Sequence, residues 1–415
     1  MKAEKILYAD TVIAGTGVSG LYAALNLPRT QKIIMITKKD LESSDSFLAQ
    51  GGICVQRDED DYDSFFEDTM RAGHYENRKE SVDIMIRSSR QIINSLIQYG
   101  VEFETVNGEL QYTREGAHHR NRILFHEDET GREITSKLLA AAKACDNIRM
   151  MEYTVMTDLI CENKSCKGIA AQTRDGETLQ IMARNVILAT GGIGGNYTHS
   201  TNFSHLTGDA LTLAERYGIL LEHLDYVQIH PTTLFSRKKG RRFLISESVR
   251  GEGALLYDAH MNRFTDELQP RDVVTKAILA QMEKDHTDHV WLDMRPIPVD
   301  VIYRHFPNIA KHCLEEGYDV TKECIPVVPA QHYFMGGIHV DSNSETTMKG
   351  VYAVGETSCN GVHGRNRLAS NSLLESLVFA KRAAYHIAGK SCDLPGRIIY
   401  PSVQDETAAN GKKII

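Results

Sequence analysis

Three glycines near the start of the chain have the spacing of a phosphate-binding turn. Gly15, Gly17 and Gly20 form a GxGxxG motif. The first permits a tight turn, the second lets the backbone approach a pyrophosphate, and the third allows a helix to pack closely on a strand. Residues 11–14 predict the strand and residues 21–27 the helix, whose free N-terminal N–H groups attract an anion. The motif therefore predicts a bound dinucleotide at this turn.

The second predicted strand narrows the choice of cofactor. Folds that bind NAD often place Asp or Glu near the end of this strand to hold the ribose, whereas here the apolar residues 33–36 lead to Lys38. A third apolar run, at 185–189, ends in Thr190-Gly191-Gly192. These features together favour FAD over NAD. Lys38 either faces a phosphate or ribose of the cofactor or is a solvated charge at a strand end, and both interpretations stay open here.

The composition is that of a globular protein with a large core. The 415 residues suggest two or three domains, and 25% charged and 42% hydrophobic residues are ordinary values. The net charge of −8 argues against a nucleic-acid surface, which requires clustered positive charge. We interpret the basic run 237–242 as a solvated loop.

The cysteines and the apolar runs indicate the cellular compartment. No apolar run approaches the length of a membrane span, and no signal-peptide core precedes the first strand, so we expect no membrane association and a cytoplasmic location. The eight cysteines are dispersed, and the closest pair, Cys161 and Cys166, lacks the CxxC spacing of zinc or iron–sulfur sites. We expect reduced thiols and no metal site.

The order of predicted strands indicates the domain organisation. A parallel sheet begins in the first 40 residues, returns at 185–189 and returns again at 350–356, before a helix at about 372–388. A sheet formed by the start, middle and end of a chain implies an inserted domain, with a site between the domains. We therefore predict an α/β protein with a Rossmann-like FAD-binding domain (1–223 and 332–390), an inserted α+β capping domain (224–331) and a C-terminal tail (391–415).

Six further motifs are more specific than the glycines. In chain order they are Ser46-Phe-Leu-Ala-Gln50-Gly51-Gly52-Ile53, His230-Pro-Thr-Thr, Arg250-Gly-Glu-Gly, Pro270-Arg271-Asp272, His332-Tyr-Phe-Met-Gly-Gly337 and Asn366-Arg367-Leu-Ala-Ser-Asn-Ser372. Over nearly the whole chain the combination resembles the fumarate reductase and succinate dehydrogenase flavoprotein superfamily. Within it, Thr113-Arg114-Glu115-Gly116-Ala-His118 resembles the L-aspartate oxidase family.

The resemblance implies a function. It implies FAD-dependent oxidation of L-aspartate to iminoaspartate, with electrons passed to oxygen, giving hydrogen peroxide, or to fumarate. This reaction is the first step of NAD synthesis from aspartate, and quinolinate synthase is the expected recipient of the imine. A soluble fumarate reductase or succinate-oxidising flavoprotein is the nearest alternative, and a catalytically silent flavin-binding or partner-binding protein is another.

The resemblance also implies residues for a dicarboxylate substrate. Guanidinium groups bind carboxylates bidentately, and Arg367 is the candidate, with His230, His332 and the Ser246 hydroxyl as further donors. Each of these residues could instead have a purely structural role. A His before Pro can cap a turn, and an Arg at a sheet end can pair with a structural acid.

Proton transfer is assigned by the resemblance to Arg271. Arginine is a poor base, so this role requires an adjacent acid, Glu247 or Asp272, and a dry site. Alternatively, Arg271 begins a helix and pairs only with Asp272.

Glu115 discriminates between substrates. Aspartate carries an ammonium group that a carboxylate can hold, whereas succinate does not, and the resemblance makes Glu115 the residue that orients the substrate. Without the resemblance, Glu115 reads as part of a loop salt bridge.

The FAD contacts follow from the resemblance by position. The Ser372 segment begins a helix whose N-terminus could stabilise a reduced flavin, or Ser372 is an ordinary N-cap. Ser44–Phe47 stands where relatives that attach FAD covalently carry a His, so we expect non-covalent FAD. The predicted FAD-binding residues are Gly15, Thr16, Gly17, Val18, Ser19, Lys38, Asp45, Ser46, Phe47, Leu48, Ala49, Gln50, Gly51, Gly52, Asp209, Glu356, Ser372 and Leu373.

Two departures from the family pattern concern length. The segment 253–271 is shorter than usual, and the family commonly ends in a helical domain of typical size that this chain lacks, which a short subgroup or a truncated form would explain. The motifs named above all precede that point, so we expect activity to be retained.

Overall fold

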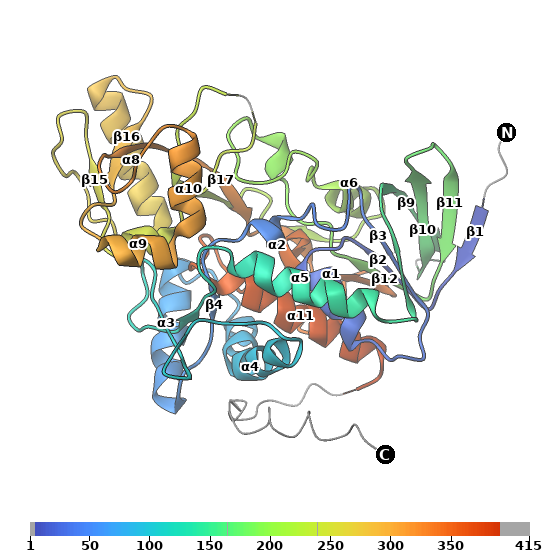
Figure 1. Cartoon of the computed structure of the whole chain (residues 1–415). Coiled ribbons are helices and arrows are strands. Elements are labelled where there is room, and N and C mark those ends of the chain that lie inside the picture. Colours follow the sequence, from blue (N-terminus) through green and yellow to red (C-terminus); the bar gives the residue numbers. More distant parts are fainter. Residues whose placement is uncertain (1–4, 164, 239, 391–415) are drawn as a thin grey trace, which may run out of the picture.

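A parallel sheet lies at the centre of the protein (Figure 1). The computed structural model describes residues 5–163, 165–238 and 240–390, so the predicted tail at 391–415 lies outside the described residues. Every pairing in the central sheet is parallel, and the chain contributes to it at its start, middle and end, as predicted. In order across the sheet, the strands are β19 (Val351–Ala353), β12 (Asn185–Leu188), β2 (Thr11–Ala14), β3 (Ile33–Ile36) and β8 (Ile148–Met151).

Both faces of this sheet are buried, which explains why its strands are continuously apolar. Ile13 and Met35 face a helical layer, whereas Val12 and Ile34 face a second sheet. The helical layer consists of α1 (Val18–Asn26), α4 (Lys79–Gln98), α5 (Thr130–Lys143) and α11 (Asn371–Ile387). The second sheet has the order β1 (Lys5–Tyr8), β11 (Thr178–Met182), β10 (Ser165–Thr173) and β9 (Thr154–Glu162), and α6 (Asp209–Arg216) joins the same core.

The helix expected at 21–27 begins earlier than predicted, at Val18. Gly17 is extended and precedes the first helical residue, so Val18, Ser19 and Gly20 form the first turn of α1. The last two glycines of the motif therefore lie at and within the helix start, where the unpaired N–H groups are.

A separate unit, on the left in Figure 1, has its own hydrophobic core, whose buried residues run from Leu234 to Val327. Its strands are antiparallel, in the order β14 (Val227–Leu234), β17 (Ile325–Phe334), β16 (Val290–Asp293) and β15 (Leu255–Tyr257). Its helices are α7 (Glu247–Gly251), α8 (Arg271–Asp285), α9 (Val299–His305) and α10 (Pro307–Glu315). The domain limits stay a prediction, and β17 crosses the predicted limit at 331 and 332.

Hydrogen bonds to Asp128 link this capping unit to the rest of the protein. The Asp128 carboxylate accepts the backbone N–H groups of Asn308 (3.2 Å) and Ile309 (2.6 Å) and the Asn308 side-chain amide (2.8 Å). These N–H groups belong to the first turn of α10, which has no partner for them within the helix. An acid from the loop before α5 therefore caps a helix of the capping unit.

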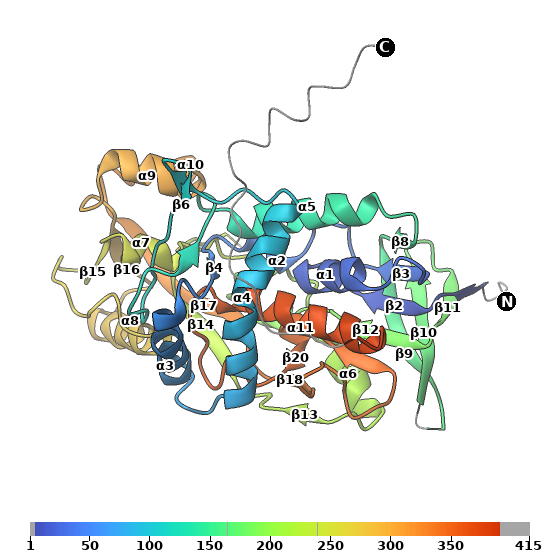
Figure 2. The same cartoon turned by 90° about the horizontal axis from the view of Figure 1, so that it is seen from below.

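Shorter elements complete the described part of the chain (Figure 2). No helix in the described ranges is long and apolar enough to cross a lipid bilayer. The shorter elements are α2 (Asp45–Leu48), α3 (Tyr62–Ala72), β4 (Ile53–Cys54), β5 (Thr105–Val106), β6 (Glu109–Leu110), β7 (Ile123–Leu124), β13 (Leu221–Glu222), β18 (Gly337–His339), β20 (Ser358–Cys359) and the 3-10 helices η1 (Glu59–Asp61), η2 (Gly194–Asn196) and η3 (Gly355–Thr357).

Candidate active site

One long cavity runs from the glycine turn of α1 to the capping unit. All the predicted FAD-binding residues except Phe47 line it. The residues predicted for substrate and proton transfer line the same cavity: Glu115, His230, Ser246, Glu247, Arg271, His332 and Arg367. The fold thus brings the two predicted sets together from segments far apart in the chain.

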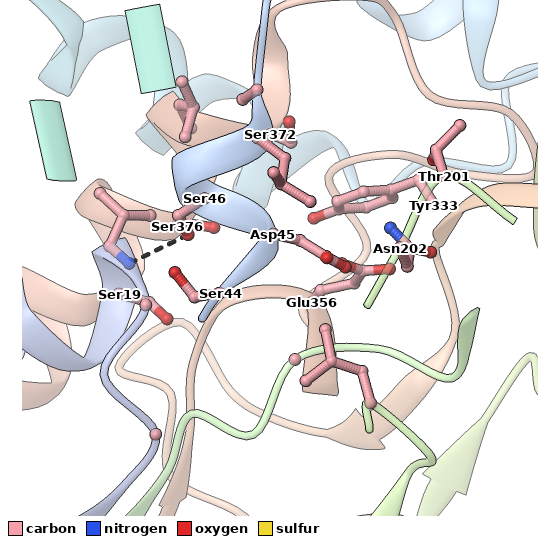
Figure 3. A pocket seen from close by; sticks show the side chains of 18 of the residues that line it. Ser19, Ser44, Asp45, Ser46, Thr201, Asn202, Tyr333, Glu356, Ser372 and Ser376 are labelled. Carbon is pink, nitrogen blue, oxygen red and sulfur yellow. Dashed lines mark hydrogen bonds between the residues drawn. The ribbon is translucent and has the colours of Figure 1, made fainter. Parts of the chain in front are cut away.

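The glycine turn forms one end of the cavity. Gly15 has a φ of +118°, and a Cβ there would lie 1.9 Å from the Ala189 carbonyl oxygen. A Cβ on Gly20 would lie 2.3 Å from the Gly15 carbonyl oxygen. Side chains at these positions would push α1 away from the ends of β2 and β12, so glycine is required for the close approach. Next to them, the Val18 N–H donates to Ser46 Oγ at 3.0 Å (Figure 3).

Lys38 lies at the cavity wall and is also paired. Its Nζ is 2.7 Å from Asp209 and donates to the His205 carbonyl oxygen at 2.7 Å. Asp209 is the first residue of α6, and both side chains are partly exposed. Lys38 therefore faces the cavity and has a counter-charge, and its contact with a cofactor stays a prediction.

Several polar atoms at the cavity fit a polar cofactor. Ser44 Oγ, Asp45 Oδ2 and Gln50 Oε1 are buried without a hydrogen-bond partner among the described residues. Buried polar groups normally have partners, so such atoms indicate groups that a ligand contacts. With the glycine turn, which admits backbone close to a pyrophosphate, these atoms fit FAD.

Two partly buried acids lie side by side in this part of the cavity, Asp45 and Glu356 (Figure 3). Asp45 accepts the Phe203 N–H and Glu356 the Phe334 N–H, both at 2.9 Å. Burial raises the pKa of Asp45 to about 7. Burial and the neighbouring Asp45 raise the pKa of Glu356 to about 8. At neutral pH this pair therefore holds at least part of a proton, which suits hydrogen bonding to the hydroxyls of a cofactor.

Phe47 and Arg241 depart from the sequence-based assignment. Phe47 does not line the cavity, and its partly buried side chain packs against the hydrophobic core of the helical layer. Arg241 belongs to the run interpreted as a solvated loop, yet it lines the cavity, and its charge favours the ionised form of Asp45. Arg241 is an exposed loop residue, as interpreted from the sequence, and its place at the cavity is what that interpretation did not include.

Arg367 is a buried cation without a paired acid. It is 4% exposed, and no carboxylate within the described ranges lies at ion-pair distance from it. Its Nη1 donates to Ser372 Oγ at 3.0 Å, its guanidinium lies over the Tyr333 ring, and its Nε has no partner among the described residues. Burial and the Arg271 charge lower its pKa to about 10, so it stays charged at neutral pH. A buried unpaired cation requires an anion, which a substrate carboxylate can supply.

Arg271 is paired with Glu247 and not with Asp272. Its Nε donates to Glu247 Oε2 at 2.5 Å, and its Nη1 donates to Gln228 Oε1 at 2.9 Å. Arg250 lies on the other side of Glu247, at 3.6 Å. Burial alone would raise the pKa of Glu247, but the charges of Arg271 and Arg250 outweigh burial and lower it.

Asp272 turns away from this group, towards His74 at 3.4 Å. Of the two acids proposed as the partner of Arg271, Glu247 therefore has the required position.

The two predicted histidines lie together, with ring centroids 5.2 Å apart. His230 is within β14, so it does not cap a turn, and its Nε2 lies 3.0 Å from the Ile245 carbonyl oxygen. His332 Nδ1 lies 2.7 Å from the Thr201 hydroxyl. Burial and the nearby Arg271 lower both pKa values well below the ordinary histidine value. Both rings are neutral at neutral pH, so the positive charge here comes from arginine.

Glu115 is buried in the cavity and is not part of a loop salt bridge. Its Oε1 accepts the Ser248 hydroxyl at 2.8 Å, and its Oε2 accepts the Ser370 hydroxyl at 2.5 Å. Burial and the charge of Glu247 raise its pKa, and Arg271 and the two serines oppose that shift.

Sequence reasoning missed several residues of the cavity. Besides Arg241, these include the two serines that hold Glu115 and the residues that position Arg271 and His332. Tyr333 and Ser370 stand inside two of the motifs, but the role of each of these residues depends on a partner more than thirty residues away in the chain. They are Thr201, Gln228, Ser248, Tyr333 and Ser370.

The parallel sheet, the glycine turn and the cavity define an FAD-binding flavoprotein with a capping unit over its active site. The FAD binding domain family matches residues 10–373. The chain is 50% identical to L-aspartate oxidase of Clostridium perfringens, over 91% of this chain and 86% of the relative. It is 48% identical to L-aspartate oxidase of Clostridium acetobutylicum, over 92% and 88%. The chain therefore belongs to the L-aspartate oxidase family.

Solved structures agree with the fold. The E. coli quinol–fumarate reductase flavoprotein superposes with a TM-score of 0.87 at 30% identity, covering 93% of this chain and 70% of that one. Mycobacterium smegmatis Sdh1 superposes with a TM-score of 0.79 at 30% identity, covering 98% and 72%. The predicted α/β class, with a Rossmann-like FAD-binding domain and an inserted capping domain, is confirmed.

Proposed function

We propose that this protein oxidises L-aspartate to iminoaspartate, the first step of NAD synthesis from aspartate. The observation that carries the proposal is Glu115, an acid of the cavity whose carboxylate is held by two serines, whereas the neighbouring Glu247 is paired with Arg271. The family relationship supports the same substrate. FAD, when bound, supplies the acceptor for the hydride that leaves the substrate's Cα. The electrons then pass to oxygen or fumarate.

The substrate's two carboxylates and its ammonium group have separate partners in this proposal. Arg367 binds one carboxylate, because its buried charge has no acid partner among the described residues. The neutral His230 and His332, with Ser246, line the cavity as polar contacts for the other carboxylate. Glu115 accepts the ammonium group and fixes which way round the substrate lies.

Arg271 is proposed to exchange the proton. Its Nε lies 2.5 Å from Glu247, whose lowered pKa keeps it ionised as the adjacent acid that this role requires. Gln228 holds the opposite side of Arg271, so the guanidinium keeps one orientation. Burial of both groups keeps bulk water from competing for the proton.

Four finer points stay proposals. FAD is bound non-covalently, since the loop before Gly51 carries no histidine between Ser43 and Gln50. The residues that hold it are the predicted set without the Phe47 side chain. Quinolinate synthase consumes the imine product. The protein is cytoplasmic.

The test is anaerobic mixing of the purified holoprotein with L-aspartate. We expect the flavin absorbance to bleach, with D-aspartate as the matched control that presents its Cα hydrogen on the wrong side. Intact flavin that L-aspartate leaves oxidised would refute the proposal. Faster bleaching by succinate than by L-aspartate would favour a succinate-oxidising or fumarate-reducing flavoprotein instead, a function supported by the likeness to the E. coli quinol–fumarate reductase.

A further inference from the structure

Two serines hold the carboxylate that is proposed to bind the substrate ammonium. Ser248 donates to one oxygen of Glu115 at 2.8 Å and Ser370 to the other at 2.5 Å. We propose that Ser248 and Ser370 determine substrate specificity by holding Glu115 in place as an ionised carboxylate, which selects aspartate over dicarboxylates without an amine. The inference rests on the proposed function and adds positioning residues to it.

The hydrogen-bond pattern around the two serines favours an acceptor at Glu115. The Ser246 hydroxyl donates to Ser248 Oγ at 3.2 Å, so the single proton of Ser248 is left for Glu115. The Gly52 N–H donates to Ser370 Oγ at 3.1 Å, so the proton of Ser370 is likewise directed at Glu115. A hydroxyl has one proton to donate. A protonated Glu115 would bring a second proton to one of these contacts, so the pattern favours the carboxylate.

The backbone at Ser370 is held in an unusual conformation that fixes its hydroxyl. Its φ is +61°, in the left-handed region that residues with a Cβ rarely adopt. The Ser370 carbonyl oxygen accepts the Cys54 N–H at 3.0 Å, which ties this position to β4. Ser248 is fixed from the other side, because it lies in α7 of the capping unit, directly after Glu247. The carboxylate of Glu115 thus joins the capping unit to the FAD-binding part.

The net charge of the site determines how an ionised Glu115 affects substrate specificity. Burial raises the pKa of Glu115, and the two serines oppose that shift. The other charged side chains of this group are Arg271, Arg367, Glu247 and Arg250 behind Glu247, because both histidines are neutral there. With Glu115 ionised, the set carries one net positive charge. Aspartate carries one net negative charge and neutralises the set.

Succinate and fumarate carry two negative charges. They balance the same set only if Glu115 takes up a proton, and an unbalanced charge in a buried site is costly. Donors that keep Glu115 ionised therefore favour aspartate and disfavour the plain dicarboxylates.

The test compares the parent holoprotein with Ser248→Ala. The readouts are the KM for L-aspartate and the inhibition constant of succinate, both measured across pH. We expect Ser248→Ala to raise the aspartate KM about tenfold near neutral pH, the effect of one hydrogen bond to a charged group. The succinate constant should stay unchanged or fall, and the acidic limb of the aspartate kcat/KM profile should move to higher pH.

Two further variants separate positioning from general damage. Ser248→Thr keeps the hydroxyl and should restore the parent values. Ser136→Ala, on α5 and far from the cavity, should change neither constant. Ser370→Gly, which suits the left-handed backbone, should repeat the effect of Ser248→Ala.

Equal changes in both constants, or no change in the aspartate KM with flavin retained, would overturn the inference. Loss of FAD in both Ser248→Ala and Ser370→Gly would also overturn it, because the hydroxyls would then be structural. The proposed function fails separately, if the parent protein does not oxidise L-aspartate at all.

Discussion

Replacing Arg367 by methionine should weaken substrate binding without weakening the fold. The site lowers the pKa of Arg367 from 12.5 to about 10, a difference that corresponds to roughly 3 kcal/mol by which burial and Arg271 disfavour the charge. Methionine removes this cost. It also removes the contact with the Tyr333 ring, worth about 0.5–2 kcal/mol, and the hydrogen bond to Ser372, worth about 1 kcal/mol. We therefore expect the free energy of unfolding without substrate to stay level or rise by up to ~2 kcal/mol.

Substrate binding, in contrast to stability, should be weaker in Arg367→Met. Removing one partner of a buried charge pair costs about 2–5 kcal/mol, so the affinity for both aspartate and succinate should fall by at least ~30-fold. Denaturant unfolding with and without succinate measures both effects, because a ligand stabilises only the state that binds it. Succinate should stabilise the parent and leave Arg367→Met unchanged. Arg367→Lys is the matched control, since it keeps a charge but not the planar fork.

A different result would refute the assignment of Arg367. If Arg367→Met lost more than ~1 kcal/mol of stability and still gained stability from succinate, the guanidinium would be a structural group whose partner is the protein itself.

Three other predictions follow from the geometry. Arg271→Leu should keep FAD and lower turnover by about 10²–10⁴-fold, as measured by aspartate-driven oxygen uptake, and near-normal turnover would exclude Arg271 from proton transfer. Asp128→Ala should unpair the first turn of α10, speed hydrogen exchange in residues 299–315 and raise the aspartate KM, whereas Asp300→Ala, at an exposed acid of α9, should do neither. Burial raises the pKa values of Asp45 and Glu356 to about 7 and about 8, above those of an unfolded chain, so their protonated forms stabilise the fold. Stability of the FAD-free protein should therefore fall as pH rises from about 4, where these carboxyls ionise in an unfolded chain, to about 8, and Glu356→Gln should reduce that slope, whereas an unchanged slope would contradict the assigned pKa.

Much of the fold could be predicted because its signals are local. The apolar runs at 33–36 and 185–189 are buried on both faces of the central sheet, and such strands read as continuous apolar segments. Gly15 is required by its backbone angle and by its close approach to the Ala189 carbonyl oxygen. The start of α1 was misplaced by three residues, because the second half of the glycine motif is itself helical.

The candidate site was harder to predict, since its contacts join distant segments. Glu115 and Arg271 were found through the family resemblance, and local sequence offered salt bridges for both. Ser248 and Ser370 show the limit of sequence reasoning, because each is an ordinary serine until the fold places it 2.8 Å and 2.5 Å from Glu115, respectively. Arg241 shows the same limit, because a basic run correctly predicts an exposed loop at Arg241 but does not show that Asp45 lies nearby across the cavity.

The central claim is that Glu115 makes an amino dicarboxylate the preferred reductant. The most direct measurement is the rate of anaerobic flavin reduction by L-aspartate and by succinate, in the parent protein and in Glu115→Gln. The account predicts that L-aspartate reduces the parent flavin far faster than succinate does, and that Glu115→Gln loses most of that preference while keeping FAD. A parent flavin that L-aspartate does not reduce, or a preference that survives in Glu115→Gln, would contradict it.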